Sequence, residues 1–228
     1  MPTVPSKETI DRDPLLARIR AGGADPAANG AGERILEAAT QQVEDFGIRR
    51  FTIDDVARRV GLSRVTIYRH FPKKDRLVEA VLLRELHRFL RGVDQAVEPY
   101  ETLEERLVEG FVFGLVYLRR HRLLNRLLRT EPELLLPALT VKGEAVLAAG
   151  RKFIAGFARR EAGRGGLPLT DKEIDGVSEL LARAVLSFVL TPQSVLGLRT
   201  QSEIRRFAEH FLAPTLDALT KRPRPSRR

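Results

Sequence analysis

The chain has 228 residues, of which 43% are hydrophobic, and a formal net charge of +9. It has no cysteine, which excludes disulfides, thiol catalysis and thiolate metal sites, and its four histidines are scattered, so we expect neither a metal nor a cofactor. The sequence shows no signal peptide and no apolar run long enough for a membrane span, and it therefore predicts a soluble cytoplasmic protein.

The chain begins with a stretch that does not predict regular structure. Residues 1–31 are rich in proline and glycine, and their charges cancel, which is typical of a disordered arm. A first helix is predicted over residues 32–46, and Gly47 ends it. Its predicted buried stripe consists of apolar residues at helical spacing: Ile35, Ala39, Val43 and Phe46.

Residues 51–71 predict two short helices, 52–60 and 63–71, joined by a tight turn. Thr52 is a good N-cap with Asp55 three residues later, Gly61 ends the first helix, and Ser63 can cap the second. The apolar face of the second helix points inward and consists of Ile67 and Phe71. The pattern predicts a helix-turn-helix.

Positive charge is concentrated around this helix-turn-helix. Residues 49–76 hold nine lysines and arginines against three aspartates, a net +6, and residues 220–228 hold five basic residues. The rest of the chain is therefore net −2. Such a concentration is expected of a protein that binds a polyanion at a defined site. The alternative is an ordinary helical hairpin with a solvated basic face.

The order of features over residues 33–80 resembles the DNA-binding domain of the TetR family of transcriptional regulators. The matching residues are Ile35 to Ala39, Phe46-Gly47, Thr52-Ile53, Val56-Ala57, Gly61-Leu62-Ser63, Thr66-Ile67-Tyr68, His70-Phe71, Lys74 and Leu77. Lys73 departs from the family, whose members often carry a small polar residue there. The resemblance implies an all-α fold of about nine helices. It divides the chain into a helix-turn-helix DNA-binding domain at 32–76, a larger effector-binding and dimerisation domain at 77–219, and a basic disordered tail at 220–228.

The remainder of the chain predicts helices throughout. They cover 74–97, a stretch from 102 that breaks near Arg120-His121 and resumes in a short helix, 131–162 with a kink at Pro137, 171–191, and 201–219. Four capping boxes mark helix starts. They are Thr102 with Glu105, Thr130 with Glu133, Thr170 with Glu173, and Thr200 with Glu203.

Family position and side-chain chemistry together nominate the DNA contacts. Arg64 and Thr66 are the best base-edge candidates, because arginine can fork onto guanine and the threonine methyl can meet thymine. Arg69 suits contacts with either bases or phosphates. Tyr68 and His70 are expected to contact phosphates, and the alternative for both is a role in packing alone. The full set is Thr52, Arg64, Val65, Thr66, Tyr68, Arg69, His70, Lys73 and Lys74.

The resemblance also implies an effector pocket and a dimer interface. The pocket candidates are Phe89, Phe111, Phe113, Tyr117, His121, Phe153 and Phe157, which suit an apolar or amphipathic small molecule. The dimer candidates in the last two helices are Leu181, Val185, Phe188, Phe207 and Phe211. In both sets the alternative is ordinary intrachain core.

These features and the resemblance together predict a transcriptional regulator, and repression is the usual mode in this family. The protein is expected to bind a palindromic operator as a homodimer and to be released from it by a small-molecule effector. We do not expect an enzyme, because the sequence lacks phosphate-loop, nucleophile-elbow and zinc-protease motifs. The alternative function is a helical interaction module with nonspecific nucleic-acid binding.

Overall fold

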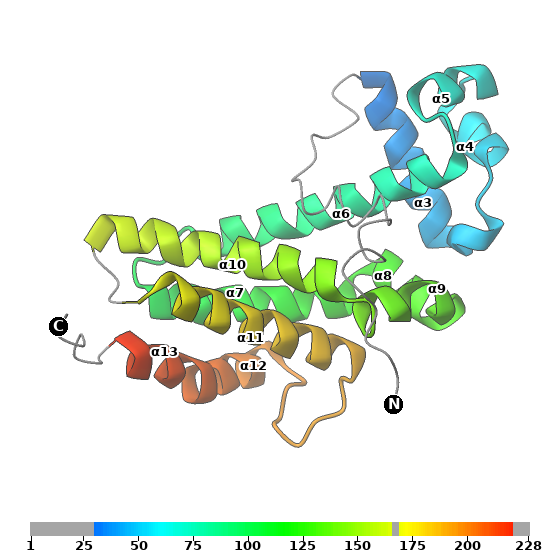
Figure 1. Ribbon diagram of the computed structural model, residues 1–228. Helices are drawn as coiled ribbons and strands as arrows, with labels where there is room; N and C mark the ends of the chain where they lie inside the picture. The colour runs from blue at the N-terminus through cyan, green and yellow to red at the C-terminus, as the bar shows by residue number, and fades with distance from the viewer. Residues whose placement is uncertain (1–29, 166–168, 221–228) are drawn as a thin grey trace, which may run out of the picture. The chain divides into compact units, whose positions relative to one another are not determined.

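A computed structural model of the chain describes residues 30–165 and 169–220, and all regular structure within them is helical (Figure 1). The helices are α3 (Gly30–Arg50), α4 (Ile53–Val60), α5 (Arg64–His70), α6 (Lys74–Val97), α7 (Leu103–Arg120), α8 (Arg122–Thr130), α9 (Pro132–Leu139), α10 (Glu144–Gly165), α11 (Asp171–Leu190), α12 (Gln201–Phe207) and α13 (Ala213–Thr220). A π-helical turn, Ala208–Leu212, joins α12 to α13. The fold is all-α, as predicted. The predicted arm and tail lie almost entirely outside the described residues.

The described residues form two compact units. Unit 1 contains residues 30–88 and 120–146, and unit 2 contains residues 89–119 and 147–220. Helix α6 therefore begins in unit 1 and ends in unit 2. The predicted domain boundaries at 76 and 219 stay a prediction. None of the described helices combines the length and the apolar character needed to cross a bilayer.

Unit 1 is built around the helix-turn-helix. Helices α3, α4 and α5 and the first half of α6 enclose an apolar core that includes Ile35, Phe51 and Ile67, all at most 1% exposed. Leu123 and Leu127 of α8 are 2% exposed in the same core. The sequence did not predict this contribution from α8. The predicted burial of Phe46 in the first helix was wrong, because that side chain is 48% exposed.

Local capping defines the ends of α4 and α5. The Thr52 side chain accepts a hydrogen bond from the Asp55 backbone N–H, and Ser63 accepts one from Thr66 in the same way. Gly61 ends α4 with φ +69°, a left-handed conformation that favours glycine. These caps confirm the predicted boundaries to within a residue.

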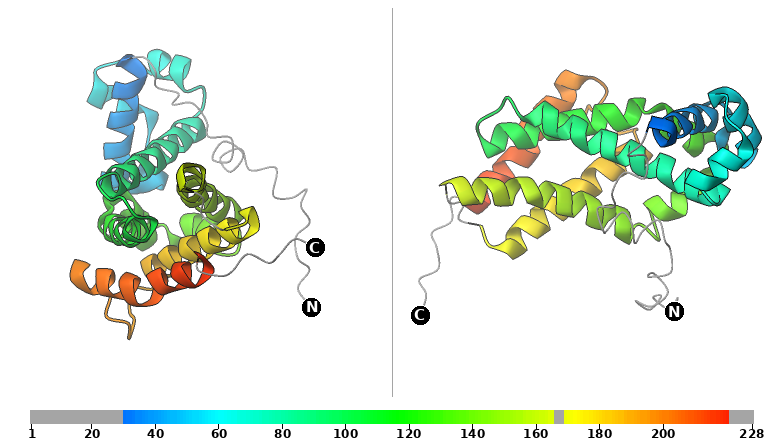
Figure 2. Two further views of the ribbon diagram at one scale, coloured as in Figure 1. Left: turned by 90° about the vertical axis from the view of Figure 1, so that its left-hand side faces the viewer. Right: turned by 90° about the horizontal axis from the view of Figure 1, so that it is seen from above.

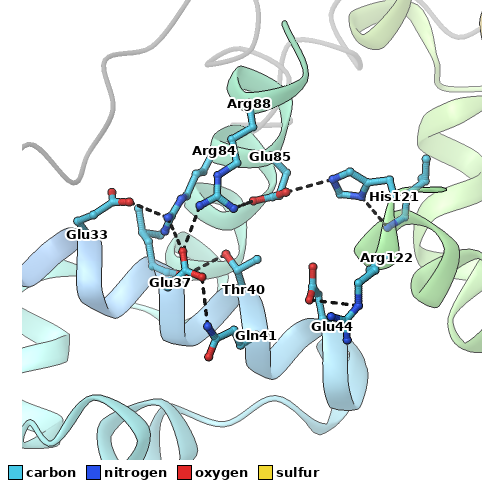
Figure 3. Close-up of polar contacts among 12 residues, drawn as sticks. Glu33, Glu37, Thr40, Gln41, Glu44, Arg84, Glu85, Arg88, His121 and Arg122 are labelled. Atoms are coloured by element: carbon cyan, nitrogen blue, oxygen red, sulfur yellow. Dashed lines mark hydrogen bonds and ion pairs between the residues drawn. The ribbon is translucent and has the colours of Figure 1, made fainter. Parts of the chain in front are cut away.

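A chain of charged side chains links α3, α6 and α8 within unit 1 (Figure 3). Arg84 of α6 is 7% exposed, and its Nη2 lies 2.6 Å from carboxylate oxygens of both Glu33 and Glu37 on α3. Arg88 lies 3.1 Å from Glu37 and 2.8 Å from Glu85. The chain reaches α8 through His121, whose Nε2 lies 3.1 Å from Glu85.

His121 also caps α8, which fixes its hydrogen-bonding roles. Its Nδ1 accepts from the Leu124 backbone N–H at 3.2 Å, so the neutral ring carries its proton on Nε2 and donates to Glu85. Burial raises the pKa of Glu85, but the hydrogen bond with His121 and the charge of Arg88 outweigh it and hold that pKa below its usual value.

Unit 2 packs α7 and α11 against α12, the π-helical turn and α13 (Figures 1 and 2). Its core contains Phe111 and Leu115 of α7 together with Ile204 and Phe207 of α12. The α11 and α12 starts are complete capping boxes at Thr170 and Thr200, as predicted. The guanidinium of Arg119 donates to the carbonyls of Phe188 and Leu198, which ties α7 to the end of α11 and the loop that follows.

The prediction of one kinked helix over 131–162 was wrong. The structure has α9 and α10 there, separated by a turn in which the Gly143 N–H donates to the Thr140 carbonyl at 2.9 Å. A Cβ at Gly143 would lie 2.9 Å from that carbonyl oxygen, so glycine permits the tight turn. With α12 to α13 taken as one continuous helix, the described residues form ten helices rather than nine.

The capping box at Thr130 was also wrong. Its hydroxyl donates to the Arg126 carbonyl at 2.9 Å and so belongs to the end of α8. Glu131 is the N-cap residue of α9 and makes no side-chain capping bond there, while Pro132 occupies the first turn.

Candidate DNA-binding site

The candidate site is the outward face of α5 with the starts of α4 and α6. Val65 is 71% exposed and Tyr68 is 40% exposed, whereas Ile67 is fully buried. Arg64 and Arg69 are also exposed, and Thr66 and His70 are partly buried. The predicted inward and outward faces therefore match the structure, and contact of these side chains with DNA stays a prediction.

The remaining candidates flank α5. Thr52 is exposed, and its hydroxyl lies 2.6 Å from Asp55 Oδ2. Lys73 is exposed, and its carbonyl accepts from the first turn of α6. Lys74 is partly buried with its Nζ 5.6 Å from the centre of the Phe51 ring, a cation–π contact that holds the lysine stem against the core.

Ion pairs neutralise much of the basic charge around the site. The pairs are Arg58 with Asp55, Arg59 with Asp45, Arg64 with Asp54, and Arg76 with Glu79, at 2.9–3.3 Å. Arg49 pairs with Glu133. Within the described part of the chain, Arg50, Arg69, Lys73 and Lys74 have no ion pair, and the last three lie in α5 or at or beside the start of α6.

A buried glutamate anchors the corner that leads from α3 into α4. Gly47 adopts φ +83° and ψ 171°, which interrupts the helical conformation of α3. The carboxylate of Glu131, which is 4% exposed, accepts the Arg49 backbone N–H at 3.2 and 3.3 Å. A Cβ at Gly47 would lie 2.1 Å from Glu131 Oε1. No sequence pattern signals this contact, which joins residues 82 positions apart.

The effector candidates do not form one group. The Tyr117 ring stacks on that of Phe113 with centres 5.4 Å apart and lies tilted against that of Phe89 at 5.5 Å, and Phe153 contacts Phe157 at 5.2 Å. All these rings belong to unit 2. Phe111 packs instead in the unit 2 core, beside Phe188 and Phe207. His121 belongs to unit 1, where it caps α8.

The dimer candidates divide by exposure. Leu181 and Phe207 are each 9% exposed, and Val185 and Phe188 pack against the same unit 2 core as Phe207. Phe211 is 54% exposed, with its ring 5.2 Å from that of Phe207. Only Phe211 of the five thus presents a large free apolar surface.

Comparison with known proteins identifies the region around the site. Residues 35–81 match the family described as bacterial regulatory proteins, tetR family. An uncharacterized HTH-type transcriptional regulator from Mycobacterium bovis is 36% identical over 77 residues, which cover 34% of this chain and 41% of the relative. The HTH-type transcriptional regulator TtgR from Pseudomonas putida is 33% identical over 105 residues, covering 44% and 50%. The chain thus spans about half or less of these relatives.

Solved structures support the fold over a longer stretch. The TetR family repressor AlkX from Dietzia has a TM-score of 0.58 at 22% identity, and the match covers 82% of this chain and 98% of AlkX. The fatty acid degradation regulator FadR from Bacillus halodurans has a TM-score of 0.51 at 16% identity, covering 77% and 93%. At these identities the likeness concerns the fold alone. The similarity to the tetR family of bacterial regulatory proteins thus covers residues 35–81, and the chain shares the fold of these solved structures over a longer stretch.

Proposed function

We propose that the protein is a sequence-specific DNA-binding repressor that acts in the cytoplasm as a homodimer on a palindromic operator. The observation that carries this proposal is the helix-turn-helix itself. Two capped helices meet at Gly61, and α5 presents Arg64, Val65 and Arg69 outward while Ile67 is buried. A helix held in this way fits the major groove, where side chains can reach base edges.

A dimer supplies what one short recognition helix lacks. A single α5 covers only a few base pairs, and a symmetric pair reads two half-sites about 34–36 Å apart. Phe211 and Leu180, which are 54% and 55% exposed in unit 2, offer apolar surface for such a pairing. The proposal includes an apolar or amphipathic effector that releases the operator, and its support is the cluster of aromatic rings formed by Phe89, Phe113 and Tyr117 in unit 2.

The test is selection of a preferred duplex from a random pool, followed by gel retardation at 150 mM salt with excess competitor DNA. We expect a palindromic sequence with half-sites one helical turn apart. Arg64→Ala should relax discrimination at one base pair of each half-site by about 1–3 kcal/mol. Lys74→Ala should weaken binding to selected and random duplexes alike and reduce the slope of log affinity against log salt by about 1.

The outcomes separate this proposal from nonspecific binding. An interaction module that binds nucleic acid without sequence preference would show only salt-labile retardation and no enriched sequence, which would contradict the proposed function. Small molecules are then screened for release of the selected duplex. If no apolar or amphipathic compound in the screen releases the duplex, that result would contradict the proposed effector and leave the proposed DNA binding intact.

A further inference from the structure

The ion pair between Asp54 and Arg64 joins the two helices of the helix-turn-helix. Asp54 is the second residue of α4, and Arg64 is the first residue of α5. The Nε atom of Arg64 lies 2.9 Å from Oδ1 of Asp54. The two side chains are 60% and 49% exposed, so both remain accessible to a bound duplex.

We infer that Asp54 is a positioning residue that determines specificity by presenting Arg64 to a guanine. This inference rests on the proposed DNA-binding function. A guanidinium has one edge that includes Nε and another formed by its two terminal nitrogens. Oδ1 of Asp54 lies 2.9 Å from Nε, and no hydrogen bond or ion pair within the described residues engages the terminal nitrogens of Arg64. Those nitrogens form the fork that matches O6 and N7 of guanine.

The carboxylate of Asp54 also affects the nonspecific binding of Arg64 to DNA phosphates. A free arginine is attracted to any phosphate, and that attraction adds affinity for every duplex. The Asp54–Arg64 pair carries little net charge. The ion pair also restricts the rotamers that Arg64 adopts. Asp54 therefore weakens nonspecific attraction, and it reduces the conformational entropy that Arg64 loses when it binds one base.

The neighbouring aspartates do not share this role. Asp55 accepts from Thr52 and pairs with Arg58 of the same helix. Asp45 on α3 pairs with Arg59 of α4 at 3.1 Å, with side chains 39% and 33% exposed. Asp45 is thus a matched control, because its removal changes the net charge equally and frees an arginine outside α5.

The experiment compares Asp54→Ala, Asp54→Asn, Arg64→Ala, the Asp54→Ala/Arg64→Ala double variant and Asp45→Ala with the unaltered full chain. Each protein is titrated with the selected duplex, with the same duplex carrying A·T at the Arg64-dependent position, and with a random duplex. Asp54→Ala should reduce the preference for guanine by about fivefold, the upper range for an exposed ion pair. Its affinity for random DNA should rise, because Arg64 is then free to bind phosphates.

Three comparisons are decisive. Asp54→Asn retains an acceptor oxygen, so its preference for guanine should lie between those of the unaltered chain and Asp54→Ala. Asp54→Ala should have no further effect on base preference in the Arg64→Ala background. Asp45→Ala should leave base preference unchanged, although the added positive charge can tighten all binding.

Several results would overturn the inference while the proposed function stands. These are a selected duplex in which Arg64 does not govern a guanine, an unchanged preference in Asp54→Ala, and an equal effect of Asp54→Ala with and without Arg64. Failure of the unaltered chain to select any duplex would instead refute the proposed function, and the inference with it. Urea unfolding of each variant checks that the fold is retained.

Discussion

At residue 47 the backbone adopts φ +83° and ψ 171°, a conformation that is almost restricted to glycine. Any side chain there would also meet the carboxylate of Glu131, since a Cβ would lie 2.1 Å from Oε1. Two independent effects therefore oppose substitution at this one position. Gly61 provides the natural comparison, because it has φ +69° but a Cβ added there would have no neighbouring atom within 4 Å.

We expect Gly47→Ala to lower the free energy of unfolding by about 2–3 kcal/mol, because backbone strain and displacement of Glu131 act together. Gly61→Ala should cost only about 1 kcal/mol, from the left-handed conformation alone. Equilibrium urea denaturation measures both values. Equal losses in the two variants would show that the contact with Glu131 contributes nothing.

At the level of the elements, sequence predicted helix boundaries well wherever they depend on local chemistry. The caps at Thr52, Ser63, Thr170 and Thr200 all use partners three residues away, and the structure confirms them. Thr130 has the same spacing to a glutamate but bonds backward to Arg126, because α8 continues to that residue. A spacing rule cannot choose between a helix end and a helix start.

Most side-chain contacts between different helices could not be predicted from the sequence. The pairing of Asp54 with Arg64, and the bond from Arg49 to Glu131, depend on how helices pack, and neither has a periodic signal. The same holds for His121. Its cap on α8 and its bond to Glu85 have no sequence signal, and its place in an effector pocket stays a prediction.

The α3–α6–α8 charge chain makes stability depend on pH. Burial raises the pKa of Glu37 and Glu85, but other effects hold both pKa values below the ordinary value of 4.5. For Glu37 these are a hydrogen bond from Arg88 and the charges of Arg84 and Arg88, and for Glu85 the hydrogen bond from His121 and the charge of Arg88. Carboxyls with depressed pKa values contribute stability above the unfolded-state pKa, and that contribution is lost as the pH falls through the folded-state pKa. We therefore expect the free energy of unfolding to decrease below about pH 4.5.

Glu85→Gln should cost about 2 kcal/mol at pH 7, because it weakens charge-assisted bonds to Arg88 and His121. The variant should also lose less stability than the unaltered chain between neutral and acidic pH. Urea denaturation across that range measures the difference, and Glu104→Gln at the exposed start of α7 serves as the control. Parallel pH profiles for the unaltered chain and Glu85→Gln would contradict the role of this network.

At the scale of the whole molecule, the proposed dimer depends on apolar surface left over after the chain has folded. Four of the five sequence-predicted interface residues belong to the packed interior of unit 2 or lie against it, and Phe211 remains 54% exposed. Leu180 of α11, which the sequence analysis did not single out, is 55% exposed. Periodicity locates an apolar stripe, but it cannot divide that stripe between intrachain and intermolecular contacts.

Phe211→Glu should raise the dimer dissociation constant about tenfold or more, because a charge replaces a large apolar side chain at the interface. Val141→Glu is the control, since Val141 is 87% exposed in the turn between α9 and α10 of unit 1, outside the helices that carry the proposed interface. Sedimentation velocity over a concentration series measures both. A monomeric unaltered chain, or equal weakening by the two substitutions, would argue against an interface at Phe211.

Unit 1 is discontinuous in sequence, and this has a consequence for how such regulators can be recombined. The family match ends at residue 81, yet Leu123 and Leu127 complete the apolar core of the matched helices. Glu131 accepts the Arg49 N–H at the corner between α3 and α4. A chimaera that joins residues 30–81 to a foreign sensor domain would leave that core open unless the incoming segment supplied equivalent side chains. The segment that carries the proposed DNA-reading helix therefore depends structurally on residues of unit 1 that lie outside the family match. Exchange of specificity is better achieved by replacing the surface of α5 than by moving the whole segment.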